Sequence, residues 1–337
     1  MTAPSVTPDP PRELQVEVTG ACNLRCRMCL VRYAPAIGRR EGALSYEQFV
    51  ELVDGLPDLR RLTLQGLGEP LLSPHLLDMV GRATARGIDV GFNTNAVLLD
   101  GRRARRLIEL GLAWLHVSLD GATASTYEEI RHGTALAPRP GQFDRVVANL
   151  RRLVALREAA GSQEPHVEIV FVAMRRNIEE LPALVELGAD LGVDRVHVQN
   201  LSHTFDDTDP AGAYREIRTY AAGEALFGVG AEERRDAVFA DARARAGELG
   251  VSLRLPGSGG GTPGCTWPWD SAYVTHRGEV QPCCMVMGSD RARLGDLHQS
   301  SFGEIWHGDA YREFRRRLLG DDPPAVCRGC SLYHGVF

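Results

Sequence analysis

The chain has 337 residues, 44% of them hydrophobic, which is enough for one large domain with a sizeable core and a smaller one. Its 44 acidic and 38 basic residues are spread along the sequence and give a net charge of -6, a pattern that argues against a nucleic-acid partner. All 38 basic residues are arginines, so no lysine can serve as a nucleophile or general base. The first residues lack the apolar core of a signal peptide and no stretch is long enough to span a membrane, so we expect a cytoplasmic protein without a membrane partner.

Strand-like and helix-like segments alternate from residue 13 to about residue 255. Apolar runs predict six strands, at 14–18, 62–65, 88–92, 114–119, 167–173 and 196–201. Two of the intervening helices begin with cap signals: Ser45 with Gln48 fits a capping box, and Asn177 with Glu180 is an Asn-headed version of it. This alternation is typical of an α/β fold with a parallel sheet, in which ligand-binding groups gather at the carboxyl ends of the strands.

A glycine-rich segment from Pro256 to Gly264 predicts a flexible linker, and with it a boundary between a first domain (1–256) and a second domain (257–337). After the linker, residues 272–282 predict a hairpin that turns at Arg277-Gly278, and residues 301–319 predict one helix.

The chain has eight cysteines, three within residues 22–29 and five after residue 264. Because the cytosol keeps thiols reduced, metal binding or redox chemistry is a better interpretation than disulfide bonds. The gap between the two groups predicts two separate sites.

The first group is Cys22, Cys26 and Cys29, a CxxxCxxC sequence shortly after the first predicted strand. Three thiolates can bind three irons of a [4Fe-4S] cluster and leave the fourth iron open to a small bidentate ligand. The alternative is a zinc site or a set of buried thiols. Structural zinc requires four ligands, however, and no fourth Cys or His lies nearby in the sequence.

Three motifs together resemble the radical S-adenosylmethionine (SAM) superfamily: CxxxCxxC after the first strand, Gly-Leu-Gly-Glu-Pro (66–70) after the second, and Ser-Leu-Asp-Gly (118–121) after the fourth. The resemblance covers essentially the whole chain. It implies a partial (β/α)6 TIM-like barrel and a [4Fe-4S] cluster that binds SAM. It also implies that an external one-electron donor, such as flavodoxin or ferredoxin, drives cleavage of SAM to a 5'-deoxyadenosyl radical, which abstracts a hydrogen atom from the substrate.

The resemblance also implies which residues surround SAM. Glu69 would hold its amino group, with Leu67 standing where the family more often has glycine. Ser118 and Asp120 would meet the ribose hydroxyls. Taken singly, each motif could equally be a turn or a surface loop, and it is their order on successive strand ends that carries the assignment. The predicted cofactor-binding residues are Met28, Gly66, Gly68, Glu69, Asn93, Asn95, Ser118 and Asp120.

The second group resembles the SPASM/Twitch extension, a small hairpin-plus-helix domain that holds an auxiliary iron-sulfur cluster. The resemblance implies a second [4Fe-4S] cluster bound by Cys265, Cys283, Cys327 and Cys330. Zinc is the alternative, since four thiolates ending in CxxC also suit a tetrahedral ion. Cys284 is then a spare thiol that could return a hydrogen atom to a substrate radical, a buried thiol without such a role, or the ligand in place of Cys283.

Polar residues at the end of the sixth predicted strand are candidates for substrate contacts: Gln199, Asn200 and His203. A structural role is an equally good interpretation of His203. The expected substrate is a small polar natural product (a sugar, aminoglycoside or nucleoside) that is oxidised, epimerised or decarboxylated. Two features favour this expectation. The first strand begins at about residue 13, which leaves no room for an N-terminal peptide-recognition domain, and only one auxiliary cluster is predicted. The alternatives are a maturase that modifies a ribosomal peptide, and a non-catalytic metal-binding interaction protein.

Overall fold

The computed structural model describes residues 4–33, 42–131, 140–227, 232–257 and 263–337. Within them the strands form one ten-stranded sheet in the order β10-β9-β8-β1-β2-β3-β4-β5-β6-β7. The predicted linker falls largely on residues 258–262, outside the described part, so the domain boundary at residue 256 stays a prediction. No described helix is both long and apolar enough to cross a membrane.

Seven neighbouring strands of this sheet, β1 to β7, run parallel to one another. The first six correspond to the six predicted strands, whereas the short β7 was missed because its three residues are at least partly exposed and carry no apolar run. The strands are β1 (Glu13–Val16), β2 (Arg61–Thr63), β3 (Asp89–Thr94), β4 (Trp114–Ser118), β5 (His166–Val172), β6 (Arg195–Gln199) and β7 (Ser252–Arg254).

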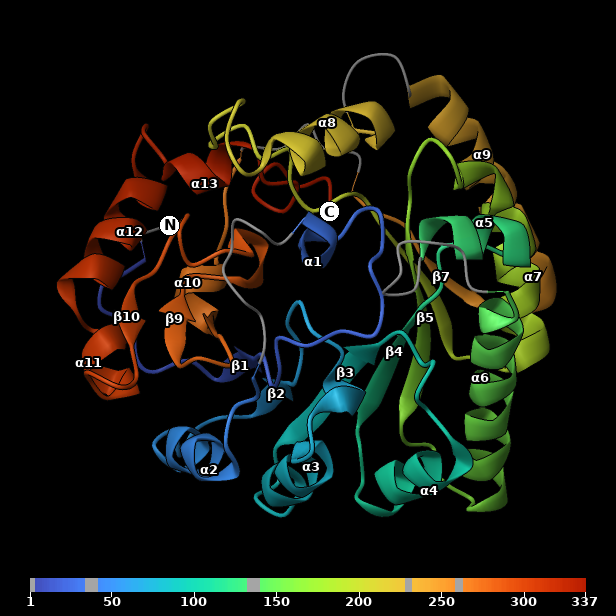
Figure 1. Cartoon of the computed structure of the whole chain (residues 1–337), viewed down its shortest axis with the longest axis horizontal. Helices are drawn as coiled ribbons and strands as arrows, with labels where there is room; N and C mark the ends of the chain where they lie inside the picture. The colour runs from blue at the N-terminus through green and yellow to red at the C-terminus, as the bar shows by residue number, and fades with distance from the viewer. Residues whose placement is uncertain (1–3, 34–41, 132–139, 228–231, 258–262) are drawn as a thin grey trace.

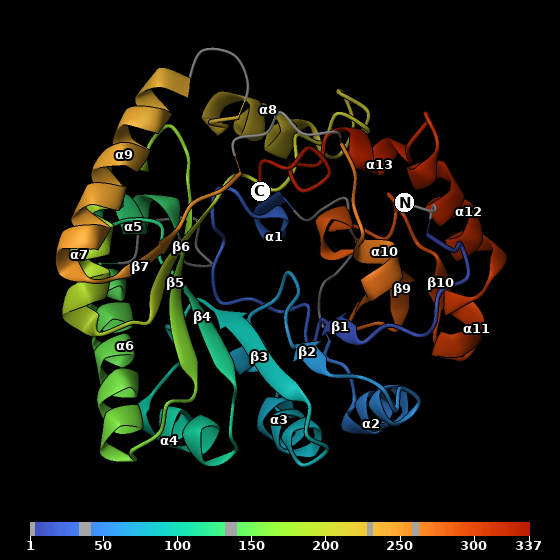
Figure 2. The same cartoon turned by 180° about the vertical axis from the view of Figure 1, so that it is seen from behind.

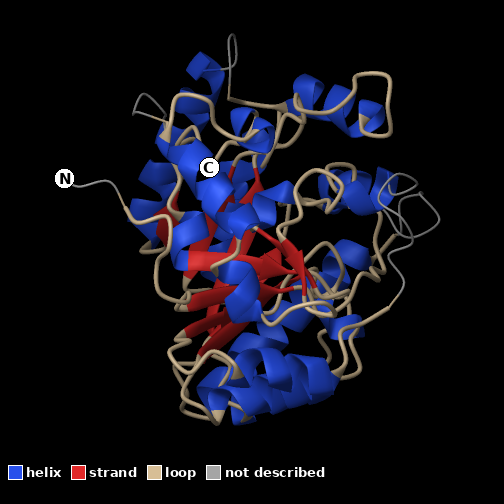
Figure 3. Ribbon diagram, turned by 90° about the vertical axis from the view of Figure 1, so that its left-hand side faces the viewer, coloured by secondary structure: helices blue, strands red, loops and turns tan. Residues whose placement is uncertain are grey.

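Helices cover the outer face of the curved sheet, and the strands lie inside them (Figures 1 and 3). Helix α8 (Arg215–Glu224) instead lies over the carboxyl ends of the strands, on the same side as α1 (Leu30–Tyr33). The covering helices are α2 (Tyr46–Asp54), α3 (Leu76–Thr84), α4 (Gly101–Glu109), α5 (Ala124–Ile130), α6 (Gln142–Ala159), α7 (Leu181–Leu191) and α9 (Glu232–Leu249). This arrangement is a parallel sheet of the partial TIM-like barrel type, as predicted.

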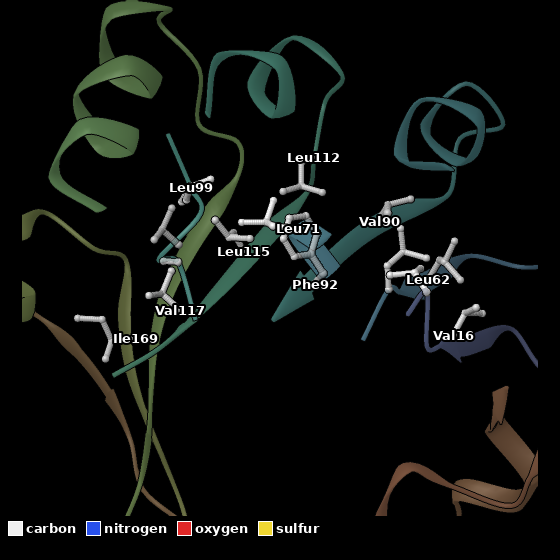
Figure 4. Close-up of a cluster of buried hydrophobic side chains, with 14 of the residues drawn as sticks. Val16, Leu62, Leu71, Val90, Phe92, Leu99, Leu112, Leu115, Val117 and Ile169 are labelled. Atoms are coloured by element: carbon white, nitrogen blue, oxygen red, sulfur yellow. The ribbon is translucent and has the colours of Figure 1, made fainter. Parts of the chain in front are cut away.

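Apolar side chains from successive strands form the core between the sheet and its helices. Figure 4 shows them side by side: Val16 from β1, Leu62 from β2, Phe92 from β3, Val117 from β4 and Ile169 from β5, all fully buried. Because a parallel sheet of this kind is covered on its faces, its strands read as nearly continuous apolar runs, which is why the sequence revealed them.

The C-terminal segment continues the same sheet. Strand β8 (Ser271–Val274) pairs in parallel with β1, with Glu13 opposite Ser271 and Val16 opposite Val274. Strands β9 (Glu279–Gln281) and β10 (Gly295–Asp296) follow in antiparallel order at the edge, beside α10 (Trp267–Asp270), α11 (Phe302–Trp306), α12 (Asp309–Leu319) and α13 (Ala325–Arg328) (Figures 1 and 2). The predicted hairpin is confirmed, and Gly278 has the positive φ (78°) that its turn requires.

Two predictions of helix ends need correction. The capping box at Ser45 is present at the start of α2. The cap predicted at Asn177 is not formed, and α7 begins only at Leu181, after a 3-10 turn. The side chain of Asn177 instead accepts a hydrogen bond from Met174 N and donates to Asp120 O and Val172 O. The single helix predicted for 301–319 is two helices, interrupted where the backbone at Gly308 is extended (ψ 166°).

Candidate functional site

The three N-terminal cysteines follow β1 and line a cavity of about 260 Å³ at the carboxyl ends of the strands. Burial raises the pKa of the Cys22 thiol, and it raises the pKa of Cys26 to about 12. Such thiols stay protonated until a metal centre replaces their protons. The three thiols therefore fit metal binding.

Glu69 lines the same cavity and is only 2% exposed. Its carboxylate accepts hydrogen bonds from the Thr94 hydroxyl (2.6 Å), from Asn95 N (2.8 Å) and from Leu71 N (3.2 Å). Burial raises the pKa of this carboxyl group. The loops that follow β2 and β3 therefore hold Glu69 in one orientation at the cavity wall.

Seven of the eight predicted SAM-binding residues line this cavity: Met28, Gly66, Gly68, Glu69, Asn93, Asn95 and Ser118. They come from different strand ends, which parallel pairing brings to one edge of the sheet. Asn95 is held further by a hydrogen bond from its Nδ2 to Asn23 Oδ1 (2.9 Å). SAM contacts by these residues stay a prediction, and the cavity gives that prediction a common location.

The glycines of the loop after β2 are required by its contact with the chain that follows β1. A Cβ on Gly66 would lie 2.2 Å from Glu17 Cγ, and a Cβ on Gly68 would lie 2.0 Å from Thr19 O. These distances are far inside van der Waals contact. These two glycines, predicted to bind the cofactor, thus allow a close backbone contact within the protein itself.

Asp120, the eighth residue, is fully buried and both of its carboxylate oxygens have partners. Oδ2 accepts a hydrogen bond from Arg131 Nε (2.7 Å), and Oδ1 accepts one from Val172 N (2.9 Å). Arg131 Nη1 in turn lies 3.8 Å from Cys26 Sγ. In this structure Asp120 holds an arginine against a cysteine of the N-terminal group, and its predicted ribose contact stays a prediction. Sequence reasoning missed Arg131, which belongs to no motif.

The C-terminal cysteines also lie near one another. Cys283 and Cys327 share an apolar cluster, and burial followed by the neighbouring Cys330 raises the pKa of Cys327 to about 12. Burial raises the pKa of Cys265 to about 11. Within the part of the chain that the structure describes, no three Cys, His, Asp or Glu side chains are grouped closely enough for a single metal ion.

Cys284 begins a 3-10 turn (Cys284–Val286) beside this group. Burial and then the neighbouring Cys330 raise its pKa, which reaches about 12. Among the described residues, Cys284 is not in the wall of the cavity that the N-terminal cysteines line. Its role as a hydrogen-atom donor stays a prediction.

The polar residues after β6 fasten the C-terminal segment to the barrel. His203 is 1% exposed, its Nδ1 accepts a hydrogen bond from Phe205 N (2.7 Å), and its Nε2 donates to Val326 O (2.6 Å). Burial and then Arg291 lower its pKa to about 4. Asn200 donates to Val336 O, and Gln199 ends β6. Substrate contacts by Gln199, Asn200 and His203 stay a prediction, and the hydrogen bonds of His203 and Asn200 described above are made within the protein.

A second cavity, of about 330 Å³, lies next to the first and shares Leu67 and Met287 with it. Its wall contains Glu17, one residue after β1, and His276, two residues after β8. Glu17 Oε2 accepts a hydrogen bond from His276 Nδ1 (2.8 Å), and Glu17 Oε1 accepts one from Leu67 N (2.8 Å). Sequence reasoning missed this pair, because only the parallel pairing of β1 with β8 brings the two residues together.

Comparison with known proteins gives two family matches. Residues 16–187 match the model of the radical SAM superfamily, and residues 265–331 match SPASM, an iron-sulfur cluster-binding domain. The mycofactocin maturase MftC of Mycobacterium tuberculosis is 35% identical, over 96% of this chain and 77% of that protein. The AdoMet-dependent heme synthase of Methanosarcina barkeri is 28% identical, over 95% of this chain and 91% of that protein.

A third relative is matched only in part, and one solved structure shares the fold. The tungsten-containing aldehyde ferredoxin oxidoreductase cofactor-modifying protein of Pyrococcus furiosus is 31% identical over 56% of this chain, which spans about half (51%) of that protein. Streptococcus suis SuiB bound to the precursor peptide SuiA superimposes with a TM-score of 0.68 at 15% identity, over 94% of this chain and 76% of that chain. The likeness to SuiB concerns the fold alone.

The close contact between Gly66 and Glu17 leads to a test with a matched control. Gly66→Ala must displace Glu17, so we expect it to destabilise the protein by about 1–3 kcal/mol, measured as a lower midpoint of thermal unfolding. Gly247→Ala, in α9 with open space around the added methyl group, is expected to stabilise by roughly 0.5–1 kcal/mol. Equal midpoints for the two variants would contradict the contact.

Proposed function

Because the chain belongs to the radical SAM superfamily and carries a C-terminal SPASM domain, we propose that it modifies a peptide, starting with removal of a hydrogen atom. The chain is a radical SAM enzyme, and its cofactors are SAM with a [4Fe-4S] cluster and an auxiliary iron-sulfur cluster. It needs a substrate and an electron donor. A peptide replaces the small polar natural product as the first choice of substrate.

One observation carries the choice of a peptide, the 35% identity to a mycofactocin maturase over 96% of this chain. That relative is a maturase by name, and the match extends over nearly the whole of this chain. The heme synthase is less similar, at 28% identity. The fold shared with SuiB is compatible with a peptide substrate and adds no weight of its own.

We assign the cofactors to residues as follows. Cys22, Cys26 and Cys29 hold the cluster that binds SAM, because they line the cavity in which Glu69 and the two asparagines at the end of β3 also lie. Cys265, Cys283, Cys327 and Cys330 hold the auxiliary cluster, a second [4Fe-4S] cluster. When bound, SAM and its cluster supply the radical that takes the hydrogen atom. The chain itself orients the substrate and excludes water from the cavity.

Arg131 has a defined part in this assignment. Its guanidinium is paired with the buried Asp120 and places an N–H 3.8 Å from the sulfur of Cys26. Hydrogen bonds and positive charge beside a ligand sulfur tune the reduction potential of an iron-sulfur cluster. We infer that Asp120 and Arg131 act as positioning residues for the cluster, and that the electron comes from an external protein such as flavodoxin or ferredoxin.

The function is tested with anaerobically reconstituted holoenzyme, SAM, a reductant and synthetic peptides encoded by the genes next to its own. We expect mass spectrometry to show a modified peptide and 5'-deoxyadenosine in equal amounts, with label from the deuterated peptide appearing in the 5'-deoxyadenosine. The variant with Cys22, Cys26 and Cys29 all changed to Ala is the control and should form neither product.

The outcome that would overturn the proposal is also defined. A sugar, nucleoside or other small molecule that transfers its label to 5'-deoxyadenosine, while no peptide does so, would return the substrate to the class first expected from the sequence.

The assignment of the auxiliary ligands leads to a second test. Cys283→Ala should lose the iron and sulfide of the auxiliary cluster and keep the SAM-binding cluster, whereas Cys284→Ala should keep both. Iron and sulfide analysis with Mössbauer spectroscopy distinguishes the two variants. The reverse result would make Cys284 the ligand. A change in product or in solvent deuterium incorporation with intact clusters in Cys284→Ala would instead make Cys284 a hydrogen-atom donor.

A further inference from the structure

The second cavity contains two buried polar atoms that lack partners. His276 Nε2 and Gln281 Oε1 have no hydrogen-bond partner in the described part of the chain, and both residues line this cavity. His276 is 9% exposed and Gln281 is less exposed still. Buried polar atoms in native proteins are almost always hydrogen-bonded, so these two atoms need a partner that the described chain does not supply, which is water or a polar ligand in the cavity.

Glu17 fixes the chemical state of His276. It is itself 3% exposed, and its Oε1 is held by a main-chain donor, Leu67 N, so its Oε2 is left to face the imidazole. A carboxylate accepts only, so Nδ1 of His276 carries a proton, and in the neutral imidazole Nε2 is left with a lone pair. This is the arrangement of a carboxylate that orients a histidine for proton transfer.

The position of the cavity in the fold is that of a ligand site. Strand β1 lies between β2 and β8 in the sheet. The strands that follow β1 in the sequence extend the sheet in one direction, and β9 and β10, which follow β8, extend it in the opposite direction, so the strand order reverses between β1 and β8 (Figure 2). In open α/β sheets, ligands bind outside the carboxyl ends of the strands at such a reversal. Glu17 and His276 lie beyond the carboxyl ends of these two strands, and the cavity adjoins the one that we assign to SAM.

We propose that this second cavity is the substrate subsite, and that His276 is a catalytic residue whose Nε2 accepts a hydrogen bond and then the proton from an N–H or O–H of the bound peptide. In that step the donor's bond to hydrogen breaks, its electron pair stays on the substrate, and the proton bonds to Nε2. The resulting imidazolium keeps its Nδ1–H on Glu17, which compensates the charge. The identification of the ligand as a peptide rests on the function proposed above. The location of the subsite is independent of that function.

Charged groups of both signs line the cavity in which this proton transfer would take place. Besides Glu17, the cavity is lined by Glu279 on β9, by Asp290 and Arg293 on the loop before β10, and by Arg277 in the hairpin turn. Tyr273 on β8 is the remaining titratable group. Arg277, Asp290 and Arg293 are exposed, which places them at the mouth of the cavity. A mouth with both signs of charge suits a peptide, whose polar groups are also of both kinds.

The variant Glu17→Gln changes the protonation of His276 while it keeps the size and shape of the side chain at position 17. Of the two main-chain donors to the Glu17 carboxylate, Leu67 N lies at 2.8 Å from Oε1 and His276 N at 3.4 Å from Oε2. We therefore expect the amide oxygen to stay on the closer donor, Leu67 N–H, so that the amide NH2 faces the imidazole. His276 Nδ1 then accepts, and the proton moves to Nε2, which becomes a donor. The variant therefore keeps the loop that holds SAM and reverses the nitrogen that faces the cavity.

The first measurement uses the peptide identified for the enzyme. We expect His276→Gln and Glu17→Gln to lower kcat for the peptide about 100-fold or more. His298→Gln is the matched control, since His298 is an exposed histidine that contacts the same turn through Arg277 O. Peptide turnover by His276→Gln at the wild-type rate would overturn the proposal and leave the peptide function standing.

The second measurement needs no substrate, so it decides the subsite even if no peptide is turned over. Diethyl pyrocarbonate acylates a histidine nitrogen that carries a lone pair. We expect mass spectrometry of the treated holoenzyme to show modification of His276, about tenfold slower in Glu17→Gln because the proton has moved to Nε2. Modification of His298 without His276, or equal rates at His276 in the wild type and Glu17→Gln, would overturn the proposal.

Discussion

The carboxylate of Glu17 joins the parts of the molecule on which the site depends. One oxygen holds the main chain of the loop after β2, and the other holds the imidazole that follows β8. Gly66 must lack a side chain to let this contact form. Because Glu17 itself follows β1, a single buried side chain fixes the loop of the SAM cavity, the first strand and the C-terminal hairpin relative to one another.

Parallel pairing explains why so much of the first cavity could be predicted from the sequence. The apolar runs gave the positions of β1 to β6, and their carboxyl ends necessarily meet at one edge, so motifs that follow different strands converge there. Seven residues chosen from those motifs line one cavity. What the motifs could not reveal is how each side chain is used, as Asp120 illustrates by bonding to Arg131 and Val172 N.

The features that the sequence did not reveal depend on contacts between distant segments. The pairing of β8 with β1 joins residues more than 250 positions apart, and no local pattern specifies it. The Glu17–His276 pair depends on that pairing. Asn177 shows the same limit locally: its side chain has the chemistry of a helix cap, yet bonds to the ends of β4 and β5 satisfy it instead. Tertiary contacts in these cases outweigh local preference.

The C-terminal segment is fastened to the barrel at two places, and this fixes the distance between the two cysteine groups. On one side β8 pairs with β1. On the other, the loop after β6 bonds to the CxxC turn, through Thr204 N to Gly329 O (3.0 Å) and Ser331 Oγ to Ser202 O (2.9 Å). A segment held at both ends cannot swing as a rigid body without breaking one attachment. The cavity between the attachments therefore keeps its shape, so a substrate bound over His276 meets the SAM cavity in a preformed geometry.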